Sequence, residues 1–163
     1  NFSAPRYMLL AAAPMALAVG DRLTRRGAAL MAAFSLCLSL CLVHAERGYA
    51  ASADSVARQI SASASSPGFY TGEWTFRWRM EAAGWSFGRD SAARTNPASR
   101  PFAAAVNAGP GVSPAEAPKL RVSAGGPGLR LLDARSSVGW YSETLGFWPL
   151  GWSDAPLEEG WLW

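Results

Sequence analysis

The chain has 163 residues, half of them hydrophobic, and a formal net charge of +3. Arg22, Arg25 and Arg26 alone account for this basic excess, so we expect no nucleic-acid partner. The only cysteines, Cys37 and Cys41, lie inside an apolar run, which excludes a disulfide framework and a cysteine-based zinc site.

The first predicted element is an apolar run from residue 2 to residue 19, interrupted by Arg6 near its start and by Pro14 in its middle. Membrane helices tolerate such a proline where neighbouring groups satisfy the freed carbonyl. Arg6 and Tyr7 fall at the depth of a lipid headgroup belt. We therefore predict a membrane helix here. Because the sequence begins directly with this apolar run, we expect it to be part of a longer protein.

A short arginine-rich turn, residues 20–26, separates this run from a second one, residues 27–43, which carries no charge. A helix of that length nearly crosses the ~30 Å hydrocarbon layer. Short arginine-rich loops stay cytoplasmic. The predicted fold is a membrane α-helical hairpin of two transmembrane helices (1–45), with a cytoplasmic loop, followed by a small mixed α/β extracytoplasmic domain (46–163).

Small residues in the second run point to further helices. In a helix, Ser35 and Ser39 share one face, and Cys37 and Cys41 share the opposite one. Small faces let neighbouring helices approach closely. In a hairpin of two helices, each helix packs against one neighbour and needs one such face. We therefore expect upstream transmembrane helices of the same protein as further partners, together with membrane lipids.

The outer domain shows short elements. We predict helices over 50–66 and 73–83, an irregular loop over about 91–118, and strands over 69–71, 85–87, 119–122, 129–132 and 138–141.

The helix over 73–83 has the clearest pattern in the outer domain. Thr71 or Gly72 is a suitable cap, and Gly84 can end the helix. Glu73, with Arg77 and Glu81, lines one face at i, i+4 spacing. Glu73 could act as a catalytic acid or base. The favoured interpretation is structural: its carboxylate forms part of a salt-bridged helix face.

The sequence contains no self-sufficient catalytic constellation. His44 is the only histidine, so neither a histidine triad nor a multi-histidine metal site can be built. We predict no catalytic residue, metal or cofactor for this chain. The eight tryptophans form either sugar-stacking platforms or, the favoured interpretation, core positions plus a belt resting on the membrane.

Three segments together resemble a known group of proteins. These are the helix opening at Arg6-Tyr7-Met8-Leu9-Leu10, YTGEWTFRWRME from residue 70 to 81, and LRLLDARSSVGWYSETLGFWPLGWSDAPLE from residue 129 to 158. They resemble the C-terminal part of bacterial integral-membrane glycosyltransferases of the GT-C type, the group of protein O-mannosyltransferases and the aminoarabinose transferase of lipid A.

The resemblance implies a multi-span enzyme of the bacterial plasma membrane. Such an enzyme moves a sugar from a polyprenyl-phosphate carrier to an acceptor on the outer face. Its catalytic acidic residue lies in the first outer loop, upstream of this chain. Arg6 and Tyr7 would bind the carrier phosphate, although a snorkelling arginine beside an aromatic anchor is the alternative. Gly72, Glu73 and Trp74 belong to a motif that the resemblance leaves without a role.

Two other hypotheses stay open. The arginines followed by the apolar run and Val43-His44-Ala45 are also typical of a signal peptide, which would release a secreted tryptophan-rich binding domain near Ala45. That hypothesis leaves the first apolar run unexplained. The third hypothesis is a two-span membrane protein whose outer domain only binds a partner.

Overall fold

The structure is a computed structural model, and it describes residues 20, 24–88, 100–107, 117–130, 132–133, 138–139 and 151–163. The predicted first membrane helix lies outside the described residues, as does most of the predicted 91–118 loop. The chain divides into two compact units, Asn1–Arg47 with Leu129–Gly151 and Gly48–Gly128 with Trp152–Trp163.

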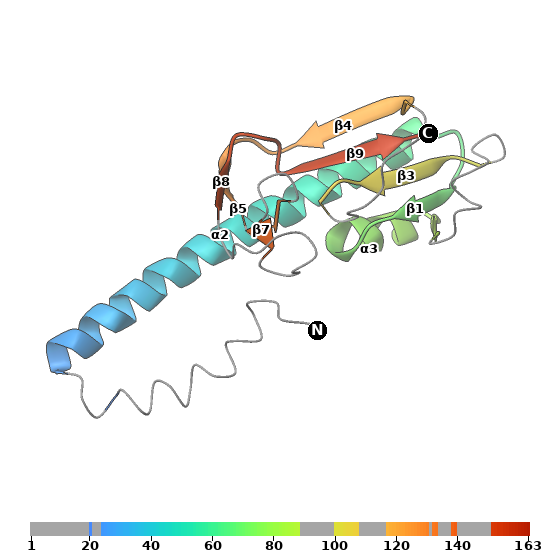
Figure 1. The fold of residues 1–163 in the computed structure, drawn as a ribbon. Helices are drawn as coiled ribbons and strands as arrows, with labels where there is room; N and C mark the ends of the chain where they lie inside the picture. Colours follow the sequence, from blue (N-terminus) through green and yellow to red (C-terminus); the bar gives the residue numbers. More distant parts are fainter. Residues whose placement is uncertain are drawn as a thin grey trace. The chain divides into compact units, whose positions relative to one another are not determined.

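The longest element is a single helix, α2 (Arg25–Ser63), of 39 residues (Figure 1). At ~1.5 Å per residue it is about 58 Å long. Thr24 caps its start, because its Oγ1 accepts a hydrogen bond of 3.2 Å from the Gly27 N–H. We predicted a membrane helix over the run 27–43 and a separate helix over 50–66, and the break between them is wrong. The alanines, leucines and arginines on both sides are strong helix formers, and no glycine–proline signal interrupts them.

The first part of α2 is apolar and exposed. Leu30 is 73% exposed and Phe34 69%, and Leu36, Leu40 and Val43 are also exposed. By length and composition this helix could cross a membrane. A contiguous set of exposed apolar side chains is typical of a surface that contacts lipid or another protein segment.

The second compact unit contains a five-stranded mixed sheet in the order β2-β1-β3-β9-β4. The strands are β1 (Phe69–Thr71), β2 (Ser86–Phe87), β3 (Phe102–Ala105), β4 (Leu120–Ala124) and β9 (Glu158–Leu162). β1 runs parallel to β2 and β3, and β9 runs antiparallel to β3 and β4. A second helix, α3 (Trp74–Ala82), connects β1 to β2.

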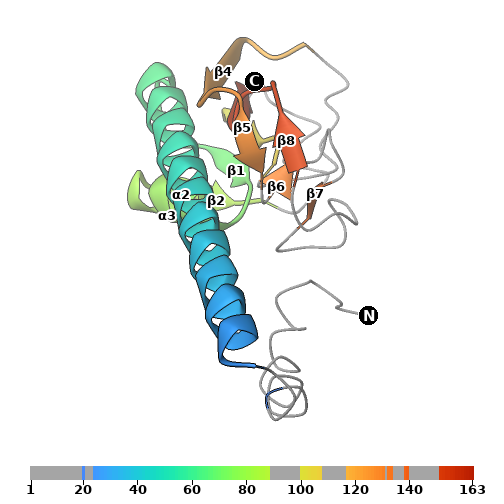
Figure 2. The same cartoon turned by 90° about the vertical axis from the view of Figure 1, so that its left-hand side faces the viewer.

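The second part of α2 and helix α3 lie against one face of this sheet (Figures 1 and 2). The core on this face holds buried side chains from both helices and from four strands, namely Ala53, Val56, Ala57, Ile60, Tyr70, Phe76, Met80, Ala103, Ala105, Val122 and Leu162. Gly160 of β9 lets α2 approach closely: a Cβ there would lie 2.4 Å from Val56 Cγ1 and 2.7 Å from Ile60 Cδ1.

A smaller aromatic cluster covers the opposite face of the sheet. Phe102, Ala104 and Trp163 are buried in it, and Phe69 and Trp161 pack against them. The rings of Trp161 and Trp163 meet edge to face at 5.9 Å. Two of the eight tryptophans therefore stabilise the sheet.

The first compact unit contains a short antiparallel pair, β6 (Leu132–Asp133) and β7 (Val138–Gly139). β5 (Gly128–Arg130) and β8 (Gly151–Ser153) lie where the chain passes from one unit to the other.

Most of the predicted elements of the outer domain are present. Strands occur at the positions expected for β1, β2 and β4, and helix α3 falls within the predicted 73–83. The prediction of an irregular loop over 91–118 is wrong for Phe102–Ala105, which is the central strand β3. Its FAAA sequence is buried throughout, so it shows no alternation of polar and apolar residues, and alanine carries little strand preference. Strands β8 and β9 were not predicted in the aromatic tail.

Candidate functional site

The strands β1 and β3 are parallel, so the segments that follow them leave the same edge of the sheet. Gly72, Glu73 and Trp74 follow β1, and Asn107 comes shortly after β3. Antiparallel β9 begins at this edge with Glu158, since Ala105 pairs with Gly160. Ligand sites in mixed sheets collect at the carboxyl ends of parallel strands. This edge is therefore the candidate functional site.

The loop over Gly72–Trp74 has an unusual backbone. Gly72 has φ 151°, and a Cβ on it would lie 2.6 Å from Phe76 Cδ1. Trp74 has φ 52°, the only positive φ of a non-glycine residue in the described part of the chain. Such a conformation costs about 1–3 kcal/mol and persists only where the surroundings enforce it. The motif singled out from the sequence is thus a strained loop of defined shape.

Glu73 occupies the N-cap position of α3, where we predicted Thr71 or Gly72. Its backbone is extended and its side chain makes no capping hydrogen bond. The carboxylate lies 3.5 Å from Arg77 Nη1 and its side chain is 42% exposed. An N-cap carboxylate ordinarily bonds the first helical N–H groups. Here it is loosely paired and faces solvent, so it can accept hydrogen bonds from a ligand.

The predicted charged face of α3 is confirmed. Arg77 Nε lies 3.0 Å from Glu81 Oε1, and the Tyr70 hydroxyl donates a 2.9 Å hydrogen bond to the same oxygen. The Tyr70 hydrogen bond, followed by the one from Arg77, lowers the pKa of Glu81. Burial of Tyr70, reinforced by its bond to Glu81, raises the pKa of the phenol. Glu81 is therefore held by two partners in this network. Within the described part of the chain, the Glu73 carboxylate has one loose ion pair, with Arg77.

A buried carboxylate lies beneath this edge. Glu158 is fully buried and accepts hydrogen bonds from the Tyr49 hydroxyl at 3.0 Å, the Asn107 N–H at 2.9 Å and the Glu159 N–H at 3.0 Å. The Asn107 side-chain amide donates to the Leu157 carbonyl at 2.9 Å. A carboxylate so enclosed has no access to substrate, and the bonds satisfy the charge that burial would otherwise make costly. We assign Glu158 a structural role, joining α2 to β3 and β9.

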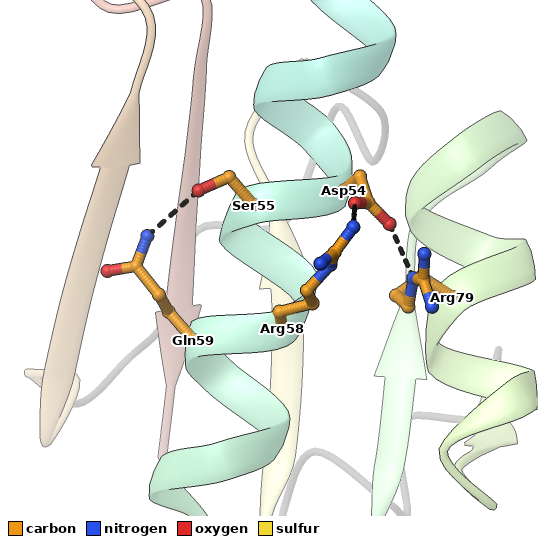
Figure 3. Close-up of polar contacts among 5 residues, drawn as sticks. All are labelled: Asp54, Ser55, Arg58, Gln59 and Arg79. Carbon is orange, nitrogen blue, oxygen red and sulfur yellow. Dashed lines mark hydrogen bonds and ion pairs between the residues drawn. The ribbon is translucent and has the colours of Figure 1, made fainter.

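Helices α2 and α3 are also joined by charge. Asp54 of α2 pairs with Arg58 of its own helix and with Arg79 of α3 (Figure 3). The neighbouring Gln59 amide donates to Ser55 Oγ at 3.1 Å on the same helix. The position of α3, and hence of the loop that precedes it, is fixed against α2 by this ion pair.

Helix α3 has exposed aromatic side chains in addition to its buried ones. Trp74 is 39% exposed and packs edge to face on Tyr49, with ring centroids 6.4 Å apart. Trp78, one turn on, is 62% exposed and lies under the Arg79 guanidinium at 5.0 Å. Only Phe76 and Met80 of this helix reach the core.

The remaining predicted site residues are placed as follows. Arg6 and Tyr7 lie outside the described residues, and His44 is exposed on α2. Within the part of the chain that is described, no three histidine, cysteine, aspartate or glutamate side chains are grouped to hold a metal ion. The sequence pattern missed Tyr49, Asn107 and Glu158, because a single glutamate gives no signal that distinguishes a buried carboxylate from an exposed one.

Comparisons with protein-family models, with curated proteins and with solved structures find no match. The arrangement itself offers one exposed carboxylate on a strained loop, two exposed tryptophans and a buried carboxylate. The exposed carboxylate and the exposed rings can contact a polar ligand.

Proposed function

We propose that this chain forms the last membrane helices and the outer domain of a multi-span glycosyltransferase of the bacterial plasma membrane. The enzyme transfers a sugar from a polyprenyl-phosphate carrier to an acceptor on the extracytoplasmic face. The anomeric carbon leaves the carrier phosphate and bonds to the acceptor oxygen, whose proton passes to a carboxylate base upstream of this chain. Arg6 and Tyr7 bind the carrier phosphate, since a guanidinium matches phosphate oxygens.

The observation that carries the proposal is the placement of the Gly72–Trp74 loop. It begins α3 beside Tyr49, which lies on the same unbroken helix as the exposed apolar face. A polyprenyl carrier presents its sugar at the membrane surface, and this loop holds the exposed carboxylate of the domain's candidate site. We assign Glu73 to hydrogen bonds with sugar or acceptor hydroxyls.

The alternative, a secreted binding domain released near Ala45, receives less support. Ala45 is buried and lies within α2, which continues through it without a break. Cleavage there would require an extended chain where α2 is helical.

The proposal is tested by transfer assays in membrane vesicles that carry the full-length protein, supplied with radiolabelled polyprenyl-phosphate sugars. Glu73→Gln is expected to lower kcat/KM for the acceptor by about tenfold, the cost of one hydrogen bond to a charged group. Glu81→Gln is the matched control, because Glu81 also pairs with Arg77 and is similarly exposed. No transfer by the wild-type protein, or equal loss in both variants, would overturn the assignment.

A further inference from the structure

We propose that the outer side of β4 (Leu120–Ala124), called the β4 edge below, pairs with an extended acidic segment of a partner protein. The segment would add one strand to the five-stranded sheet. This inference does not depend on the glycosyltransferase proposal.

Strand β4 is the last strand of the sheet, beside β9 (Figure 1). Its inner side pairs with β9 in unbroken register over all five residues, from Leu120 opposite Leu162 to Ala124 opposite Glu158. The strand contains no proline, and this register has no bulge. Within the residues that the structure describes, no strand pairs with its outer side. The β4 edge is thus a regular template for a further strand.

The hydrogen bonds of β9 show which way its backbone groups point. The Trp163 N–H donates to the Phe102 carbonyl at 2.9 Å, so the backbone groups of Trp163 face β3. This direction alternates along an antiparallel strand, so those of Leu162 face β4. Leu120 lies opposite Leu162 and therefore turns its own backbone groups toward β9.

The same alternation along β4 identifies the groups at the β4 edge. Val122 faces β9 as Leu120 does, so the N–H and C=O groups of Arg121 and Ser123 point outward. Each of these two residues has one backbone donor and one backbone acceptor. A strand that pairs with the β4 edge can therefore form hydrogen bonds with both residues.

The β4 edge carries basic side chains. Lys119, just before the strand, and Arg121 within it are both exposed. In the described part of the chain, neither cation belongs to an ion pair. Glu159 on the neighbouring β9 accepts a 2.8 Å hydrogen bond from Trp161 Nε1. A strand that approaches the β4 edge thus meets two cations.

These charges select the kind of partner. If two copies of this chain paired through their β4 edges, Lys119 and Arg121 of one copy would approach those of the other. Like charges on neighbouring strands destabilise a sheet. A segment with glutamate or aspartate at alternate positions would instead place its carboxylates beside these cations. The occupant that fits the β4 edge is therefore an acidic segment, and a second copy does not fit.

The test measures the binding of a fluorescent peptide of about seven residues, in which valine and glutamate alternate, to the full-length protein in non-ionic detergent. The same peptide with lysine in place of glutamate is the charge control. We expect saturable binding of the glutamate peptide by fluorescence anisotropy, weaker binding in about 0.5 M salt, and much weaker binding of the lysine peptide. Hydrogen exchange should slow at the Arg121 and Ser123 amides and stay unchanged at Val122.

Two variants separate the charge from the backbone pairing. Arg121→Glu is expected to weaken binding of the glutamate peptide about fivefold, because an attractive cross-strand pair becomes repulsive. Arg47→Glu is the matched control, since it makes the same charge change at an exposed position outside the sheet. Ser123→Pro removes one outward N–H and is expected to abolish binding, although an edge strand tolerates proline at such a position. If Ser123→Pro unfolds, Arg121→Glu and the amide exchange still decide.

Three results would overturn the proposal. No saturable binding, or equal binding of the two peptides, would mean that the cations only keep the β4 edge from pairing. Binding without slower exchange at Arg121 and Ser123 would place the peptide elsewhere on the protein. Self-association of the protein that slows exchange at these two amides would assign the β4 edge to a second copy.

Discussion

Tyr49 on α2 donates a 3.0 Å hydrogen bond to the fully buried carboxylate of Glu158 on β9, joining positions 109 residues apart in the sequence. The same carboxylate receives the Asn107 N–H at the end of β3. The helix that carries the apolar face is thus fixed to the two central strands by one buried anion. This contact joins the second part of α2 to the sheet.

Tyr49→Phe removes one donor from this carboxylate and leaves the ring in place. We expect a loss of about 1–3 kcal/mol in the free energy of unfolding, because a buried charged group loses a hydrogen bond. Thermal unfolding of the detergent-solubilised protein measures it. Gln59→Ala is the control, since its bond to Ser55 is exposed and its loss is expected to cost little. Equal melting of wild type and Tyr49→Phe would show that Glu158 is adequately stabilised without Tyr49.

Gly160→Ala tests the close approach of α2 to the sheet. The added methyl would overlap Val56 Cγ1 and Ile60 Cδ1, and we expect destabilisation of about 1–3 kcal/mol. Adding Val56→Ala removes the nearest obstructing atom and is expected to restore part of the loss. Gly126→Ala is the matched control, because nothing lies within 4 Å of a Cβ there. A Gly160→Ala protein as stable as wild type would contradict the packing described.

We expect the ion pair between α2 and α3 to stabilise the folded protein more than the ion pair within α2. Arg79 is 30% exposed, against 64% for Arg58, so water screens its interaction with Asp54 less. Double-mutant cycles with Asp54→Asn should give a coupling of about 0.5–1 kcal/mol for Arg79 and a smaller one for Arg58. The reverse order would contradict this contact geometry.

The raised pKa of the Tyr70 phenol predicts a loss of stability at alkaline pH. Burial, and then the bond to Glu81, raise the pKa of its phenol above the ordinary value of 10.0. The folded protein therefore keeps the proton where the unfolded chain releases it, so the free energy of unfolding falls as pH rises above about 10. Melting temperatures from pH 8 to 12 should fall more steeply for wild type than for Tyr70→Phe. Parallel curves would show that Tyr70 does not carry the effect.

Elements with a local sequence pattern could be predicted, whereas elements that depend on distant parts of the chain could not. Helix α3 was predicted because Phe76 and Met80 recur at helical spacing and its charges pair at i, i+4. Strand β3 was missed because its partners, β1 and β9, come from distant parts of the chain and its alanines have no local preference for a strand. The continuity of α2 was missed because a change of composition at residue 44 was interpreted as a change of structure.

The candidate site was predicted only in part. The Gly72–Trp74 motif stood out in the sequence, and its strained backbone and exposed Glu73 follow from the structure. The role of Trp74 as an exposed ring did not follow, because tryptophan is expected in cores as often as at surfaces. Glu158 was missed since its burial depends on strands that meet only in the folded chain.

The most direct test of the account is the intact mass and N-terminal sequence of the native product recovered from carbonate-washed membranes. We predict a membrane-embedded protein in which α2 is uncut and continuous with the sheet domain. A soluble species beginning near Glu46 would contradict this prediction, and the secreted binding domain would replace the membrane glycosyltransferase.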